Sequence, residues 1–143
     1  MYQDGDYLPA RIIRYDIEKD LCLLELPTTK EGFVPVSIAN SGSVSTGQKV
    51  YAVGNLMNHG IGITEGIVSI PLIDLSVDGL VREVIQCDIT LAGGNSGGGL
   101  FDEEGKLVGM TSFRIRDNKG EVVYGIGFAI PSEILMLFGG LNG

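Results

Sequence analysis

Short apolar runs rich in Ile, Val and Tyr recur along this chain between turns that contain glycine, and this pattern constrains the fold more than any other feature. Such runs, separated by turn signals, are typical of strands in an antiparallel barrel or sandwich. The 22 glycines are spread among these runs and form no repeat, which also favours turns and bulges in a β-rich fold. We therefore predict an all-β chain with strands at Ala10–Tyr15, Leu21–Leu26, Gln48–Val53, Ile61–Ile70, Glu83–Cys87, Gly98–Phe101, Lys106–Phe113 and Val122–Ala129.

Two hairpin turns and one helix can be placed from local chemistry. Asp102–Gly105 and Asp117–Gly120 each put a glycine where a tight turn requires positive φ. A short C-terminal helix is expected to begin at Pro131, with Ser132 as its cap, and to stop at Gly139–Gly140.

The polar stretch Ala39–Gly47 is the best candidate for a linker. It divides the chain into an N-terminal fragment, residues 1–38, and a more complete C-terminal module, residues 48–143, on either side of a linker at 39–47.

The charge and the apolar runs exclude several classes of partner. The formal net charge is −8, which argues against nucleic acid and against anionic membrane surfaces. No apolar stretch approaches the roughly 18 residues that span a bilayer, so membrane insertion is not expected. Cys22 and Cys87 lack metal-ligand spacing and are expected to be buried free thiols, although a disulfide between them remains open. Neither a metal nor an organic cofactor is expected.

The motif Gly94-Asn95-Ser96-Gly97-Gly98 points to chemistry. A nucleophilic serine needs a sharp turn that presents its Oγ, and glycines permit that turn. The N–H groups of Gly94 and Ser96 could then form an oxyanion hole, which typically contributes about 2.7–4 kcal/mol per donor in the transition state. A glycine-rich hairpin with an incidental serine is the alternative.

Several further segments, in order, make the chain resemble the HtrA (Deg) family of trypsin-like serine proteases. They are DLCLL from Asp20, VYAVGN, TEGIVS, the block IQCDITLAGGNSGGGLF and GIGFAIPS, and together they extend from about Gly5 to Ser132. The resemblance implies a trypsin-like antiparallel β-barrel, with the second barrel complete and the first barrel truncated to residues 1–38, followed by the short helix.

The resemblance also assigns roles to individual residues. Ser96 would be the nucleophile, Asp20 the acid that orients an imidazole, and Gly94, Asn95 and Ser96 the oxyanion loop. Asp20 stands at the start of a strongly apolar strand and is therefore expected to be partly buried. The substrate-binding residues would be Ser112, Phe113 and Arg114, which pair with the substrate backbone, and Thr90 and Leu91, which approach the side-chain pocket. That pocket is expected to suit a small aliphatic residue, although Phe113 and Arg114 depart from the small or aliphatic residues common there.

The catalytic histidine is the feature that the resemblance predicts and the sequence does not supply. The family places it some tens of residues before the aspartate, whereas 19 residues precede Asp20 and none is histidine. The single histidine, His59, matches a loop of the second barrel, so an exposed loop residue is the better interpretation than a substitute base. Truncation of a longer chain, a proteolytic fragment and a natural pseudoprotease all remain open.

The function expected from these observations is a serine endopeptidase that cleaves partly unfolded polypeptides through an acyl-enzyme. This chain alone is expected to be inactive for lack of the base. A non-catalytic peptide-binding module is the alternative, and a purely structural β domain a third. The family implies a trimer and an extracytoplasmic location, while the exposed edges of a truncated first barrel would favour an edge-paired or swapped dimer.

Overall fold

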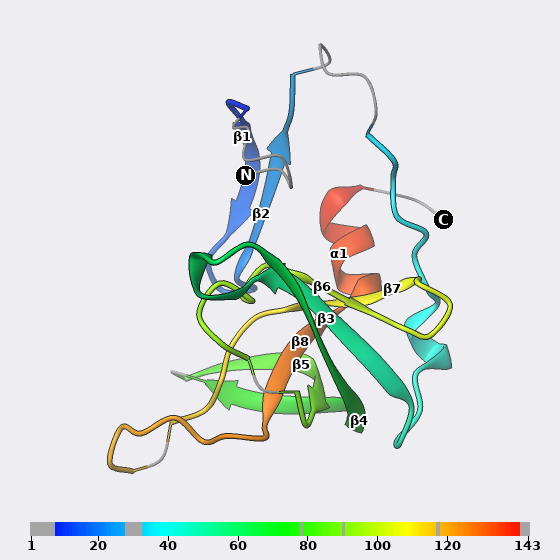
Figure 1. Cartoon of the computed structure of the whole chain (residues 1–143). Helices are drawn as coiled ribbons and strands as arrows, with labels where there is room; N and C mark the ends of the chain where they lie inside the picture. Colours follow the sequence, from blue (N-terminus) through cyan, green and yellow to red (C-terminus); the bar gives the residue numbers. More distant parts are fainter. Residues whose placement is uncertain (1–7, 28–32, 78, 90, 117, 141–143) are drawn as a thin grey trace.

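The computed structural model describes residues 8–27, 33–77, 79–89, 91–116 and 118–140 (Figure 1). Six strands form a closed barrel in the order β3-β4-β5-β8-β7-β6, and two further strands, β1 and β2, form a separate hairpin. The strands are β1 (Arg11–Asp16), β2 (Leu21–Glu25), β3 (Lys49–Asn55), β4 (Ile61–Val77), β5 (Leu80–Cys87), β6 (Gly99–Phe101), β7 (Leu107–Thr111) and β8 (Gly127–Pro131). Two 3₁₀ turns (Ser41–Ser43 and Leu56–Asn58) and helix α1 (Ser132–Gly139) complete the described elements.

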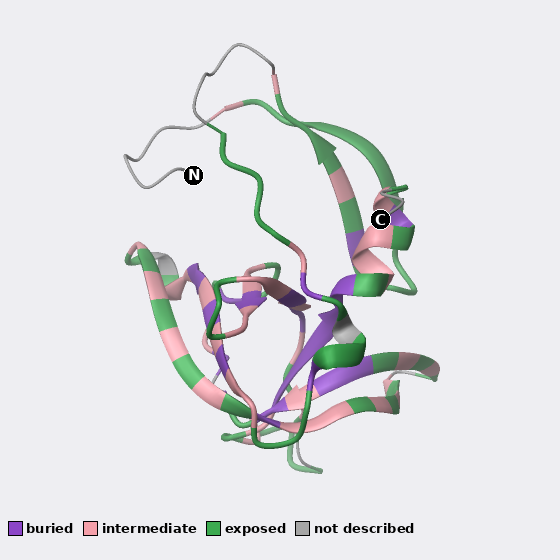
Figure 2. Cartoon of the chain, turned by 90° about the vertical axis from the view of Figure 1, so that its right-hand side faces the viewer, coloured by how far each residue is buried: buried purple, intermediate pink, exposed green. Residues whose placement is uncertain are grey.

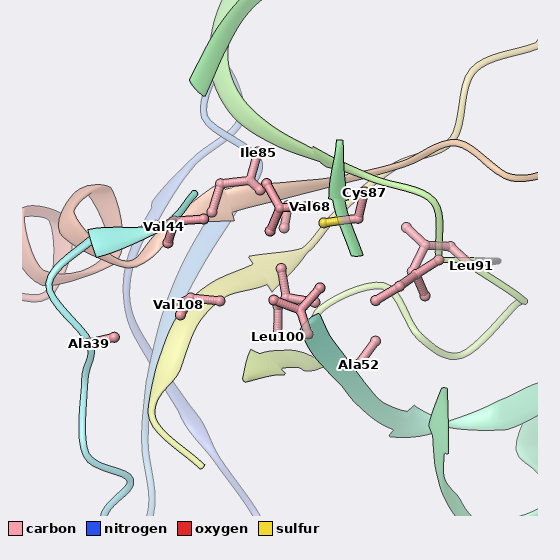
Figure 3. Packing of buried hydrophobic residues seen from close by; sticks show 12 residues of the cluster. Ala39, Val44, Ala52, Val68, Ile85, Cys87, Leu91, Leu100 and Val108 are labelled. Carbon is pink, nitrogen blue, oxygen red and sulfur yellow. The ribbon is translucent and has the colours of Figure 1, made fainter. Parts of the chain in front are cut away.

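The core fills the inside of the barrel. Along β3 buried and half-buried positions alternate, because successive side chains of a strand point to opposite faces. Figure 3 shows the side chains of Val68, Cys87 and Leu100 pointing toward one another from different strands. The whole cluster comprises Ala39, Val44, Val50, Ala52, Val68, Ile85, Cys87, Ile89, Leu91, Leu100, Val108 and Ala129.

Strand β4 is long because it serves two partners. Its first part pairs with β3, from Asn55↔Ile61 to Lys49↔Ile67, and its second part pairs with β5. The ladder with β5 is irregular between Ile70 and Ile73, which is where Pro71 lies. Proline cannot donate to a ladder and is tolerated at such irregularities, so the strand continues to Val77 beyond the end expected from the sequence.

The β1–β2 hairpin lies outside the barrel and contacts α1 (Figures 1 and 2). Leu21, Ile130 and Phe138 form a small buried cluster at this contact. Arg14 strengthens it, since its guanidinium lies 4.6 Å from the centre of the Phe138 ring and donates to the Phe138 carbonyl at 3.2 Å. The remainder of the hairpin exposes large apolar side chains, namely Ile12, Ile13, Tyr15, Ile17 and Leu24.

The expected fold class is confirmed, and both hairpin glycines have positive φ, +74° at Gly105 and +81° at Gly120. The strand expected at Val122–Ala129 is wrong in its bounds. Val122 forms only an isolated bridge with Arg116, and the barrel strand there is β8.

Two other local expectations are corrected. Pro131, and not Ser132 as expected, occupies the N-cap position of α1. The Ser132 hydroxyl is buried and donates to the Ala39 carbonyl at 3.0 Å, so it does not cap the helix. Both thiols are free, but only Cys87 is buried; Cys22 is exposed because it lies on an uncovered part of the hairpin.

The segment 39–47 packs against the barrel. Ala39 and Val44 are buried in its core, and the Ala39 N–H donates to the Leu107 carbonyl at 2.9 Å. The division of the chain at 39–47 stays a prediction. Within the described residues, no helix is long and apolar enough to cross a membrane.

Candidate active site

The loop that carries Ser96 follows β5 and leads into β6, and backbone hydrogen bonds tie it to the end of β3. The Asn55 N–H donates to the Gly94 carbonyl at 3.2 Å, and the Met57 N–H donates to the Gly93 carbonyl at 2.7 Å. Gly94 has φ +92°, and a Cβ at this position would lie 1.8 Å from the Asn55 carbonyl oxygen. Glycine is therefore required at position 94 by both conformation and space.

Strand β7 holds the other side of the same loop. The Gly97 N–H donates to the Thr111 carbonyl at 2.7 Å, and the Thr111 N–H donates to the Gly98 carbonyl at 2.9 Å. The Thr111 hydroxyl also donates to the carbonyl of Asn95. These bonds fix the backbone on both sides of Ser96, as the role expected for this residue requires.

Asn95 is the buried residue of this loop, with 1% of its surface exposed. Neither its side-chain nitrogen nor its side-chain oxygen has a hydrogen-bond partner among the described residues. A buried unpaired amide costs about 1–3 kcal/mol, so the backbone bonds, rather than the Asn95 side chain, hold the loop in this conformation.

Ser96, Ser112 and Asp20 form a hydrogen-bonded series. The Ser96 hydroxyl donates to the Ser112 carbonyl at 2.8 Å, and the Ser112 hydroxyl donates to Oδ2 of Asp20 at 2.6 Å. Ser112 thus links the expected nucleophile, Ser96 on a loop of the barrel, to the expected acid, Asp20 on the hairpin.

Asp20 differs in one respect from the expectation. It is exposed rather than partly buried, because it ends the β1–β2 turn. Its φ of +58° is unusual for a residue other than glycine. The N–H of Asp20 donates to the Ile17 carbonyl at 3.3 Å, which closes the turn.

Two backbone donors near Ser96 face no acceptor in the described part of the chain. These are the N–H groups of Gly94 and Ser96, the pair expected to bind an oxyanion. Donors that are already free and held in place act on a developing charge without reorganisation.

A pocket of about 230 Å³ opens beside Ser96. Of the expected substrate-binding residues, Leu91, Ser112, Phe113 and Arg114 line it, whereas Thr90 lies outside the described residues. The remaining lining residues, which were not expected from the sequence, are Ala92, Gly93, Arg116 and Val122. In an extended segment every second side chain lies on the same face. The sequence could therefore have predicted that Arg116, two positions after Arg114, lines the same pocket.

Arg82, near the start of β5, links this pocket to the hairpin. Its Nε donates to the Glu18 carbonyl at 2.8 Å, and its guanidinium lies 5.7 Å from the centre of the Phe113 ring. The Phe113 ring in turn stacks on Phe128, with 5.1 Å between ring centres. No sequence signal indicates Arg82, since its partners lie far from it along the chain.

His59 is exposed at the end of the 3₁₀ turn that follows β3. In the described chain, the hydrogen bond of the Ser96 hydroxyl goes to Ser112 and none joins Ser96 to His59. No group of three or more His, Cys, Asp or Glu side chains is placed to hold a metal ion among the described residues.

A closed antiparallel barrel with a serine on a glycine-rich loop, beside a pocket and backbone N–H groups that face no acceptor among the described residues, is the architecture of the trypsin-like peptidases. The family described as "Trypsin-like peptidase domain" matches residues 1–110. Together with the similarity to HtrA-type relatives and solved structures, this match shows that the chain belongs to the trypsin-like serine proteases of the HtrA family.

Relatives and solved structures agree with this assignment. The chain is 38% identical over 130 residues to the probable periplasmic serine endoprotease DegP-like of Brucella suis biovar 1, covering 91% of this chain and 25% of that protein. It is 36% identical over 132 residues to the periplasmic pH-dependent serine endoprotease DegQ of Escherichia coli (strain K12), covering 92% of this chain and 28% of that protein. The structure of the HtrA-type protease AlgW with decapeptide superposes with a TM-score of 0.83 at 29% identity, covering 97% of this chain and 42% of that one. The chain thus spans about a quarter of the length of these curated relatives.

Proposed function

We propose that this chain carries the nucleophile and the acid of a serine endopeptidase that cleaves polypeptides through an acyl-enzyme. Ser96 would be the nucleophile, Asp20 the acid, and Gly94, Asn95 and Ser96 the oxyanion loop. The observation that carries the proposal is the hydrogen-bonded series Ser96–Ser112–Asp20, which joins the expected nucleophile and acid through one intervening residue.

The reaction would proceed by attack of the Ser96 Oγ on the carbonyl carbon of the scissile bond. A base takes the hydroxyl proton, and the free N–H groups of Gly94 and Ser96 stabilise the negative oxygen of the tetrahedral intermediate. The proton then passes to the leaving amine as the C–N bond breaks, and water hydrolyses the acyl-enzyme with the same base.

The base would come from a histidine outside these 143 residues, either elsewhere in a longer protein or on a partner chain of different sequence. Such an imidazole would have to replace the Ser112 carbonyl as the acceptor of the Ser96 hydroxyl proton. Removal of the base from a triad lowers turnover by about 10⁶, so we expect this chain alone to be nearly inactive.

The segment Ser112–Arg114 would pair with the substrate backbone. Ser112 and Phe113 are bonded to β8 through the Ser112 N–H and the Phe113 carbonyl, both to Phe128. The backbone groups of Arg114 have no partner within the described residues and can bond an added strand. The solved structure of the HtrA-type protease AlgW contains a decapeptide, which supports a polypeptide ligand for this chain in general.

Location and assembly are proposed from the relatives. Two of them are named periplasmic, which favours an extracytoplasmic location for this chain. The exposed apolar side chains of the β1–β2 hairpin favour contact with further protein, as part of a trimer or of an edge-paired or swapped dimer.

A fluorophosphonate probe tests the proposal, with Ser96→Ala as the control. We expect slow labelling of Ser96 that accelerates when imidazole is added as a free base, and no labelling of the variant. Failure of imidazole to accelerate labelling would contradict the assigned nucleophile. Rapid labelling without imidazole would instead show that the chain already contains a base.

A non-catalytic peptide-binding module is the second candidate. It is favoured by the bond from the Ser96 hydroxyl to the Ser112 carbonyl, because a carbonyl oxygen that accepts this proton does not remove it as a base would. This candidate predicts that peptides bind equally well to the parent chain and to Ser96→Ala, while neither is labelled with or without imidazole.

A further inference from the structure

The pocket beside Ser96 is basic. Two arginines, Arg114 and Arg116, line it, and no Asp or Glu is among its described lining residues. This local charge is opposite in sign to the net charge of −8 of the whole chain. It therefore reflects the placement of these two residues and not the composition.

The position of Arg116 is fixed by the hairpin that follows the substrate-pairing segment. Its Nη1 donates to the Gly120 carbonyl at 2.8 Å, and its backbone bridges to Val122. A guanidinium has five N–H donors, so this bond leaves others available. Arg114 makes no hydrogen bond or ion pair within the described residues, and its side chain is free to turn toward a ligand.

Two described carboxylates, those of Asp20 and Glu121, lie outside the described lining of the pocket. Asp20 is directed to the Ser112 hydroxyl, at 2.6 Å, and does not line the pocket. Glu121 is exposed and also lies outside the lining. A third guanidinium, that of Arg82, lies 5.7 Å from the ring centre of Phe113, which forms part of the wall.

We propose that this pocket selects an acidic side chain, Asp or Glu, in the residue that precedes the scissile bond. The inference rests on the proposed function, because it assigns a substrate class to the same site. It departs from the small aliphatic preference expected from the family resemblance. A planar guanidinium pairs with a carboxylate through two parallel hydrogen bonds, which neither an apolar side chain nor an amide can match.

The expected preference is modest because both arginines are exposed. Solvent-exposed ion pairs contribute little to binding free energy. We therefore expect a substrate with Glu at this position to react about three- to tenfold faster than one with the isosteric amide Gln. The preference should shrink when the salt concentration is raised, since salt screens exposed charges.

The first test is labelling of the full chain, with imidazole, by peptidyl phosphonates that are identical except for the residue next to phosphorus. Glu, Gln, Val and Lys analogues are compared, and each rate is divided by that of a fluorophosphonate without a side chain. We expect the order Glu above Gln and Val, with Lys slowest. A Val or Lys analogue that labels fastest overturns the acidic preference while leaving Ser96 as a nucleophile.

Variants locate the effect. Arg114→Met and Arg116→Met should each reduce the Glu-to-Gln ratio, and the double variant should bring it near one. Arg11→Met removes an exposed arginine on the hairpin and should leave the ratio unchanged. Equal loss in all three single variants would mean that overall charge, and not the pocket, sets the ratio.

A binding measurement keeps the inference testable if no probe labels Ser96, an outcome that would reject the proposed function alone. The side-chain Nε–H signals of Arg114 and Arg116 are followed by NMR while N-acetyl-glutamate amide or N-acetyl-glutamine amide is added. We expect both signals to shift with the acid and to stay in place with the amide. Shifts of equal size with both ligands, or with neither, overturn the inference.

Discussion

The Ser112 hydroxyl donates a hydrogen bond of 2.6 Å to the Asp20 carboxylate across 92 positions of sequence. This bond joins the β1–β2 hairpin to Ser112, whose carbonyl also accepts a hydrogen bond from the Ser96 hydroxyl. Asp20 therefore keeps its place through a contact with the barrel as well as through its own turn.

Ser112→Ala tests that contact. Loss of a partly buried bond to a carboxylate should lower the free energy of unfolding by about 1 kcal/mol and slow the imidazole-assisted labelling of Ser96. Urea unfolding and labelling rates give the two readouts. Ser76→Ala, on an exposed position of β4, should change neither, and equal behaviour of the two variants would argue against the role of the bond.

Gly94→Ala should be severely destabilising. A Cβ there would meet the Asn55 carbonyl oxygen at 1.8 Å, and φ is +92°. Left-handed backbone alone costs about 1–2 kcal/mol and overpacking adds about 1–3 kcal/mol. Gly125→Ala is the matched control, because φ is +75° but nothing lies within 4 Å of its Cβ. Urea unfolding should show the larger loss at Gly94, and equal losses would mean that the loop shifts to relieve the clash.

Much of the barrel could be predicted from the sequence, because strand patterns and turn glycines are local signals. The position of Ser96 could also be predicted, since its motif is contiguous. Asp20 could be named as a candidate acid from the sequence, and that role stays a prediction. Its exposure could not be predicted, because it depends on the hairpin lying outside the barrel.

What could not be predicted depends on distant partners. Serine is a common helix-capping residue, but the Ser132 hydroxyl donates instead to the Ala39 carbonyl, 93 positions away. Arg82 bonds to the Glu18 carbonyl, 64 positions away. No local pattern encodes such pairs, because the closed barrel and the packing of its neighbours bring them together.

Arg82→Met should loosen the turn that carries Asp20. The bond from Arg82 Nε to the Glu18 carbonyl is 2.8 Å long, and its loss should speed hydrogen exchange of the Asp20 N–H by about tenfold, since a bond to a charged group contributes about 1.5 kcal/mol or more. Amide exchange followed by NMR measures this. Arg11→Met, which removes only the exposed ion pair with Glu25, should leave that rate unchanged. An unchanged rate in Arg82→Met would show that the turn is held without it.

The two thiols should differ in reactivity. Burial raises the pKa of Cys87 to about 12, and the nearby carboxylate of Asp88 adds to this effect. The thiolate is the reactive form, so at about pH 8 iodoacetamide should modify the exposed Cys22 and spare Cys87. Peptide mapping by mass spectrometry measures both sites, with a sample in urea as the control in which both react. Modification of Cys87 in the folded chain at the rate of Cys22 would contradict its burial.

The same thiol should make stability depend on pH in the alkaline range. The pKa of Cys87 is about 12 in the folded chain against an ordinary value of 9.0, so the unfolded chain releases this proton first as the pH rises. The free energy of unfolding should be unaffected by this group below about pH 9 and should fall between about pH 9 and 12, by at most about 1.4 kcal/mol per pH unit. Cys87→Ala removes the titrating group and should show a shallower fall than the parent in urea unfolding across this range, whereas Cys22→Ala should keep the parent slope. Equal slopes in the parent and Cys87→Ala would mean that the thiol ionises as easily in the folded chain as in the unfolded one.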